Sequence, residues 1–244
     1  MSINHEMNYY NYGKTLSAEG IITPLSPKGN KESHEYVDLG LPSGILWATE
    51  NIKNENGEEL YFAWGETSGY TAHYDESSGE YVTDGKDFTW NDYTTKFGTY
   101  DENASPDYGF TKYNTNGPEI LDAEDDAAVV NWGDGWRMPT KEEFDELLEN
   151  TNSAFTVQNG VSGLLLTSTV EGYTDKFLFF PAVGYADNGQ VYSIGANGNY
   201  WSASLGSEDV NSACGLNFSG GYCGVYDDNR YYGYAVRPVF SQNL

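Results

Sequence analysis

The C-terminal part of the chain reads LNFSGGYCGVYDDNRYYGYAVRPV over residues 216–239. Tyr, Gly, Asp, Asn and Ser fill nearly all of its outward positions, whereas Leu216, Phe218 and Val225 keep the apolar alternation of a strand with one buried face. Tyr gives a large contact area at a low cost in rotamer entropy, and Ser, Gly and Asn give adaptable hydrogen bonds, as in antibody paratopes. The stretch is therefore predicted to be a recognition surface, because an enzyme site would show a few titratable groups in fixed roles.

The composition indicates a folded, loop-rich and strongly acidic protein. With 244 residues and 39% hydrophobic content, the chain can form one large domain, or one domain with a short appendage. A net charge of −25 argues against nucleic acid as a partner, since phosphate binding needs clustered Lys and Arg, and it disfavours anionic membrane surfaces. The acidity fits either solubility through self-repulsion or selection for a cationic ligand.

Cysteine and histidine usage predicts neither a disulfide framework nor a transition-metal site. Cys214 and Cys223 are expected to be free thiols, with Cys223 packed on an inward face. His5, His34 and His73 lie far apart without metal-ligand spacing, so no metal-binding residues are assigned.

The N-terminal residues differ in composition from the rest of the chain. Residues 1–34 are polar and contain Pro24, Pro27 and Gly29, which predicts an N-terminal extension or linker before a domain at 35–244. The first residues lack the basic and apolar regions of a secretory signal peptide. No segment reaches the apolar length of a membrane-spanning helix, so membrane insertion is not expected.

Short aromatic strands open the predicted domain, and a long irregular segment follows them. Strands are expected at 36–41, 45–48 and 61–65. Residues 66–118 are rich in Tyr, Asp, Thr and Gly. A stretch of this length predicts a functional loop or an insertion packed by its own aromatic residues.

Two helices and a series of strands are predicted after this segment. Asp122 is expected to cap a short helix through Val130, and a capping box at 140–143 starts a second helix that ends at Asn150. Short strands are expected at 163–167, 177–181, 189–192, 200–204, 214–218, 222–226 and 234–239. This order of elements indicates an α+β domain, with small antiparallel sheets, two flanking helices and long loops.

Six ordered blocks of the sequence recur together in one family. These blocks are residues 35–44, 61–67, 124–128, 136–140, 200–204 and 236–239. They resemble the C-type-lectin-fold domains that are abundant in Bacteroides-type gut bacteria and their phages, which are distantly similar to the formylglycine-generating-enzyme-like branch of that fold. The resemblance covers residues 35–240 and implies a C-type lectin-like fold.

Within that family, the C-terminal part is most similar to the variable proteins of diversity-generating retroelements. In such proteins, error-prone reverse transcription at template adenines rewrites a C-terminal stretch and turns Asn codons into codons for Tyr, Asp, Ser, Gly and Cys. The resemblance places a variable region at 204–234, with Phe218, Val225, Arg230, Gly233, Val236 and Pro238 as fixed scaffold. It implies these ligand-binding residues: Asn217, Ser219, Tyr222, Gly224, Tyr226, Asp227, Asp228, Asn229, Tyr231, Tyr232 and Tyr234.

The resemblance also implies a function. The chain would be a ligand-recognition protein of a phage or a cell surface, and its hypervariable face would bind a protein or glycan receptor. Its place would be extracellular or on the virion, with the N-terminal segment attached to a particle or a partner chain. The alternative is a secreted adhesion or carbohydrate-binding lectin-fold domain that is never diversified, since Tyr- and Gly-rich loops occur there too.

No catalytic residue is assigned, and the chain is not expected to be an enzyme. The formylglycine-generating members of the fold oxidise a substrate with closely spaced cysteines. Here Cys214 and Cys223 are nine residues apart, with only Arg230 nearby to lower a thiol pKa. The acidic pairs Asp125/Asp126 and Glu142/Glu143 are expected in first turns of helices, where the helix dipole and capping explain them.

A structural calcium ion is the one cofactor left open. The run Asp227-Asp228-Asn229 carries the oxygen ligands that calcium prefers. The Glu-Pro-Asn and Gln-Pro-Asp tripeptides of sugar-binding C-type lectins are absent from the sequence. Calcium-dependent sugar binding is therefore not the favoured hypothesis.

The predicted arrangement places strand 36–41 near strand 235–239 and presents residues 204–234 as one exposed face. The tyrosines of that face are expected to be aromatic anchors. Arg137 and Arg237 are expected to pair with carboxylates or backbone carbonyls. Burial is expected for the tryptophans at positions 47, 64, 132, 136 and 201.

Overall fold

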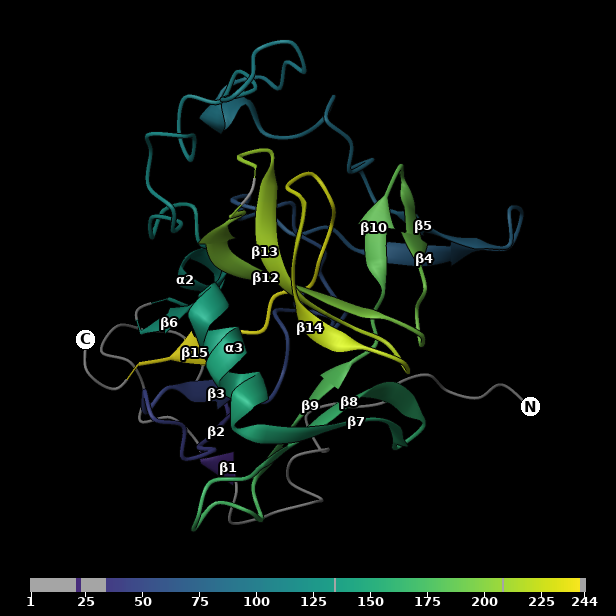
Figure 1. Ribbon diagram of the computed structural model, residues 1–244. Helices are drawn as coiled ribbons and strands as arrows, with labels where there is room; N and C mark the ends of the chain where they lie inside the picture. Colours follow the sequence, from purple (N-terminus) through teal and green to yellow (C-terminus); the bar gives the residue numbers. More distant parts are fainter. Residues whose placement is uncertain (1–20, 23–33, 134, 208, 242–244) are drawn as a thin grey trace.

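The computed structural model describes residues 21–22, 34–133, 135–207 and 209–241. Most of the predicted N-terminal extension, residues 1–34, therefore lies outside the described residues. The described part consists mainly of small antiparallel sheets with few helices, which confirms the predicted α+β class (Figure 1). No helix within these ranges is both long enough and apolar enough to cross a membrane.

One sheet brings the first and last strands of the domain together. Its strands are, in spatial order, β1 (Ile21–Ile22), β2 (Tyr36–Val37), β3 (Leu46–Ala48), β15 (Val239–Phe240) and β6 (Trp136–Arg137). Strand β3 lies between β2 and β15, so the two predicted neighbours are close but do not pair directly. The predicted strand 234–239 is shorter than expected, because Tyr234 and Ala235 form only isolated bridges, to Phe62 and Tyr200.

Two three-stranded antiparallel sheets form the centre and lower part of Figure 1. The lower one consists of β7 (Thr151–Gln158), β8 (Val161–Ser168) and β9 (Phe177–Pro181). The central one consists of β12 (Gly198–Leu205), β13 (Ser212–Phe218) and β14 (Cys223–Asn229). Strand β14 is one of the two edge strands of the central sheet.

The long segment 66–118 is less irregular than predicted. It contributes β4 (Ala72–Asp75) and β5 (Glu80–Thr83) to a four-stranded sheet completed by β11 (Gln190–Tyr192) and β10 (Tyr185–Asp187), and it contains the short helix η1 (Thr95–Phe97). The rest is packed by its own aromatic residues, as expected. Trp90 stacks on Tyr100 with ring centroids 4.0 Å apart, and it contacts Phe110 and Tyr93 as well.

Helix α3 (Lys141–Glu149) confirms the capping box expected from the sequence. The Thr140 side chain accepts from the Glu143 backbone N–H, the Glu143 side chain accepts from the Thr140 N–H, and Asn150 is the C-cap. Phe144 and Leu147 are buried in the core beneath the helix, which contacts β7, β12, β13 and β14. The helix thereby covers one face of the central sheet.

Helix α2 (Ala127–Trp132) begins later than predicted, because its N-cap is Asp126 and not Asp122. The buried Asp126 carboxylate accepts hydrogen bonds from the N–H groups of Ala128, Val129 and Met138. Asp125 is not in a first helical turn either. Its buried carboxylate binds Lys112 and the Tyr113 hydroxyl, with the Lys96 ammonium beside it.

The core contains the tryptophans that the sequence indicated. Trp47, Trp64, Trp136 and Trp201 are at most 1% exposed, and Trp132 is 6% exposed. The predicted arginine pairings are also found. Arg137 binds the Glu143 carboxylate, and buried Arg237 donates to Asn51 Oδ1 and to the Ala48 carbonyl.

The position of the α2 cap can be tested with two matched substitutions. Asp126→Ala removes three hydrogen bonds of a buried carboxylate at once and is expected to lower the free energy of unfolding by about 2 kcal/mol or more. Asp122→Ala removes only an ion pair of a half-exposed carboxylate with Lys112 and is expected to cost under about 1 kcal/mol. Urea unfolding monitored by tryptophan fluorescence measures both, and equal losses would contradict the assignment of Asp126 as the cap.

Candidate ligand-binding surface

The register of the β13–β14 hairpin divides the predicted binding residues between two faces. Antiparallel pairing places Gly224 opposite Asn217 and Tyr226 opposite Gly215. Side chains alternate between the faces of a strand, and directly opposed residues share a face. One face of β14 and the preceding turn is therefore formed by Tyr222, Gly224, Tyr226 and Asp228, and we call it the tyrosine face.

Tyr222 and Tyr226 are the exposed aromatic residues of the tyrosine face. Their side chains are 46% and 50% exposed, and their rings meet edge to face with centroids 6.1 Å apart. Burial, followed by the charge of Asp228, raises the pKa of Tyr222. Both hydroxyls can donate and accept hydrogen bonds, and much of each ring is open to a partner.

The opposite face of β14 belongs to the core. Cys223 and Val225 pack against the cluster that holds the fully buried Leu216 and Phe218. Phe218 and Val225 therefore occupy the scaffold positions that the sequence assigned to them. The hairpin is anchored by one face, and Tyr222 and Tyr226 remain exposed on the other.

Asp227 lies on this second face and not with Asp228. Its Oδ2 accepts from the backbone N–H of Ser207 at 2.8 Å and from the Ser207 hydroxyl at 3.1 Å. Its Oδ1 lies 3.1 Å from the Cys214 sulfur, which donates to it. Asp227 therefore positions the loop after β12, and the expectation of one continuous exposed face over 204–234 is corrected here.

The opposite orientations of the Asp227 and Asp228 carboxylates argue against a shared calcium ion. Asp227 and Asp228 point to opposite faces of one strand, so their side chains cannot converge on one ion. Among the described residues, no group of three or more His, Cys, Asp or Glu side chains is arranged to hold a metal. The Asp227-Asp228-Asn229 run thus offers no preformed calcium site.

Asn217, Asp228 and Tyr234 form a hydrogen-bonded layer beneath the open tyrosines. Asn217 Nδ2 donates to Asp228 Oδ2 at 2.6 Å, and Asp228 also binds Tyr234. Tyr234 stacks on Trp201 with centroids 4.2 Å apart. At 8% and 2% exposure, Asn217 and Tyr234 do not lie on the exposed face where they were expected, and they support it from below.

Burial shifts the pKa values of two residues in this layer. Desolvation raises the pKa of Asp228, and desolvation with the nearby Asp228 charge raises that of Tyr234 well above its ordinary value. A buried carboxylate held by two donors remains a strong acceptor. It fixes the Asn217 and Tyr234 side chains on which the exposed residues rest.

The remaining predicted residues occupy the two ends of the hairpin. Ser219 lies in the turn, where its hydroxyl accepts from the Gly221 N–H. Asn229 is half-buried at the end of β14, and its carbonyl accepts from the N–H of Tyr232. Tyr231 and Tyr232 are half-buried and continue the aromatic packing, Tyr231 against Trp90 and Tyr232 against Tyr234.

The glycines of this region separate into open and closed positions. A Cβ at Gly221 would meet nothing within 4 Å, and one at Gly224 would meet only the mobile end of the Tyr226 ring, at 3.1 Å. At Gly215 a Cβ would lie 2.9 Å from a backbone carbonyl, and at Gly233 it would lie 2.6 Å from the Phe88 ring. Side chains can therefore be added to the tyrosine face but not to the positions beneath it.

Several residues next to this surface were not predicted from the sequence. Tyr185 contacts Tyr232 and Tyr234, and Asn199 pairs in register with Asn217. Trp90 and Ser207 reach the hairpin from segments that are distant in sequence or outside regular strands. Tyr185 and Tyr192 flank a tight turn, and this spacing could have indicated the β10–β11 hairpin. No local sequence pattern indicates that Tyr185 contacts Tyr232 and Tyr234.

Comparison with known proteins places part of this region in a family model. Residues 168–239, which include β12, β13 and β14, match a family described as a domain of unknown function (DUF8237). No curated protein and no solved structure matches the chain. The family match is therefore confined to the C-terminal part that contains the hairpin.

The environment of the two cysteines predicts very low thiol reactivity. Cys214 pairs with Asp227, and Cys223 pairs with Phe218. Residues 214 and 218 are four positions apart on β13, so the two cysteines are ~13 Å apart, which is too far for a disulfide. Burial raises the pKa of Cys223 to about 11 and raises that of Cys214 too. At pH 7 we expect the folded protein to react negligibly with Ellman's reagent over minutes, while the urea-unfolded chain releases two equivalents. A thiol of the folded protein that reacts within seconds would contradict this expectation and would make an oxidase function worth testing.

Proposed function

We propose that this chain is a ligand-recognition protein with a C-type lectin-like fold, whose tyrosine face binds a protein or glycan receptor. The proposal includes diversification of that face by a retroelement and display on a phage particle or a cell surface. It includes no catalytic role. Six sequence blocks that resemble C-type-lectin-fold domains support the fold, together with the small antiparallel sheets and the capped helix α3.

One observation carries the proposal. The β13–β14 hairpin presents two half-exposed tyrosines and an open glycine on one face, while alternate residues of the same strand pack into the core. Exposed tyrosines on a rigid support lose little conformational entropy on binding. Amino-acid substitutions on the tyrosine face would leave the core-facing side of the hairpin intact. A surface that is diversified needs this separation.

The second candidate is a constant adhesion or carbohydrate-binding domain. It shares the fold and the tyrosine-rich surface, and it differs in expecting one ligand for all copies of the protein. The open positions at Gly221 and Gly224 favour the diversified form, because a constant surface needs no tolerance for added side chains there.

The binding role can be tested with an internal control. The exposed pair Tyr74 and Tyr81, on β4 and β5, has the same edge-to-face geometry at 5.3 Å but lies on another sheet. Labelled protein is incubated with intact gut bacteria, and binding is measured by flow cytometry. The double substitution Tyr222→Ala/Tyr226→Ala is expected to weaken binding by about 30-fold or more, since a central tyrosine contributes about 2 kcal/mol.

Tyr74→Ala/Tyr81→Ala is expected to leave binding unchanged, and both double variants should keep the unfolding midpoint of the wild type. Equal loss of binding in the two variants would contradict the assignment of the tyrosine face. Loss of folding in Tyr222→Ala/Tyr226→Ala would show that these residues belong to the core.

A further inference from the structure

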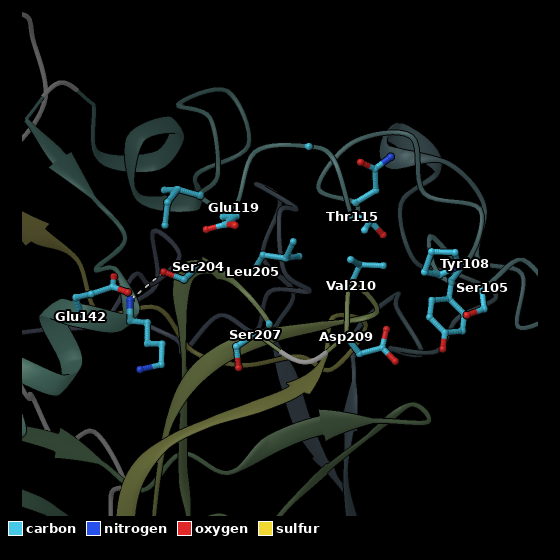
Figure 2. A pocket seen from close by; sticks show the side chains of 16 residues that line it. Ser105, Tyr108, Thr115, Glu119, Glu142, Ser204, Leu205, Ser207, Asp209 and Val210 are labelled. Carbon is cyan, nitrogen blue, oxygen red and sulfur yellow. Dashed lines mark hydrogen bonds between the residues drawn. The ribbon is translucent and has the colours of Figure 1, made fainter.

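A cleft of about 590 Å³ lies outside the tyrosine face, between the 105–120 segment and the end of β12. Figure 2 shows Ser204 and Leu205 on its floor, with Glu119 and Glu142 on one side and Tyr108 and Asp209 towards the other. A cavity of this size is within the usual range for specific ligand sites.

The floor of the cleft is held by backbone hydrogen bonds. The Leu205 N–H donates to the Glu119 carbonyl at 2.7 Å, and the Leu121 N–H donates to Ala203 at 2.9 Å. The Ser204 hydroxyl accepts from the Lys141 N–H at 2.9 Å at the start of α3. The cleft is therefore preformed by the junction of a loop, a strand and a helix.

Ser204 offers a hydrogen bond that the protein does not use. Its side chain is 5% exposed and lines the cleft. Within the described ranges its hydroxyl accepts one hydrogen bond and donates none. A buried donor without an acceptor is costly, so a ligand that brings a carbonyl oxygen to this floor would satisfy it.

The sides of the cleft carry uncompensated negative charge. In the part of the chain that the structure describes, the carboxylates of Glu119 and Glu142 form no hydrogen bond or ion pair. Lys141 also lines the cleft, but its ammonium is paired with Asp145 at 2.6 Å. Asp209 adds a third carboxylate, whose Oδ1 accepts from the Asn211 N–H, and the whole chain carries −25. Clefts lined by one sign of charge concentrate ligands of the opposite sign.

Apolar groups complete the lining. Leu205, Val210 and the 42%-exposed Ile120 offer contact to an alkyl chain, and the Tyr108 ring offers a face to a cation. Long basic side chains pack their methylene stems on apolar surface while the charged end reaches polar partners. A neutral sugar would gain hydrogen bonds here but nothing from the uncompensated charge.

We infer that this cleft binds an arginine or lysine side chain of a protein partner, with a backbone carbonyl of the same segment accepting from Ser204. The charged end lies between Glu119 and Glu142, and the stem lies on Leu205 and Val210. The site is independent of the tyrosine face. Asp227, on the opposite face of β14, is linked to the cleft through Ser207 and through Cys214, which donates to the Leu205 carbonyl.

The test uses matched probes and matched variants. ¹⁵N NMR titration compares acetyl-Gly-Arg-Gly-amide with acetyl-Gly-citrulline-Gly-amide, which differ in charge but hardly in shape. The arginine peptide is expected to shift the amide signals of Leu205, Gly206 and Ser207, and the citrulline peptide is expected to leave them in place. Glu119→Gln and Glu142→Gln should each weaken arginine-peptide binding about three- to tenfold.

The control is Glu149→Gln, which removes the same charge from an exposed glutamate at the other end of α3. It should leave the dissociation constant unchanged. Equal binding of the citrulline peptide, an equal effect of Glu149→Gln, or shifts confined to residues outside the cleft would each overturn the proposal. Because these readouts do not involve Tyr222 or Tyr226, they stand apart from the test of the tyrosine face.

Discussion

The pairing of β13 with β14 is the constraint on which the exposed surface depends. Seven residues of β14 pair in register with seven of β13, and strict alternation then decides which side chains enter the core. Val225 and Cys223 fill the space against Leu216 and Phe218, so a shift by one residue would bury Tyr226 and expose Val225. The energy of the core thus fixes the orientation of every residue on the tyrosine face.

Arg230 fixes the end of the same hairpin to the long 66–118 segment. Its guanidinium is fully buried, lies over the rings of Trp64 and Phe110, and donates to the carbonyl of Tyr113. Desolvation lowers its pKa, which is the cost of holding a cation in an aromatic pocket. Residue 230 therefore ends the exposed part of the hairpin, and the chain beyond it returns to the core.

The features that sequence predicted are those with local causes. The capping box at Thr140 and the inward positions of Cys223 and Val225 depend on residues a few positions apart, and both are confirmed. The prediction that Asp227 and Asp228 share one exposed face was wrong. Asp122 was predicted as the cap of α2, but the cap is Asp126. The Asp126 carboxylate also accepts from the N–H of Met138, which follows β6, and this contact cannot be predicted from residues near Asp126. The burial of Tyr234 depends on Trp201, and no local pattern shows that contact. The role of Asp227 likewise depends on Ser207, across the sheet.

The account rests on a hairpin in which one face can change while the other carries the fold. Sequencing of the 3′ end of natural copies of this gene tests it most directly. The account predicts amino-acid changes concentrated at template-adenine codons for Ser219, Tyr222, Gly224 and Tyr226, with Gly215, Phe218 and Gly233 unchanged, because a Cβ at either of those glycines meets backbone or ring atoms at 2.9 Å or less. Changes scattered evenly over both faces, or only synonymous ones, would contradict it and favour a constant domain with a single ligand.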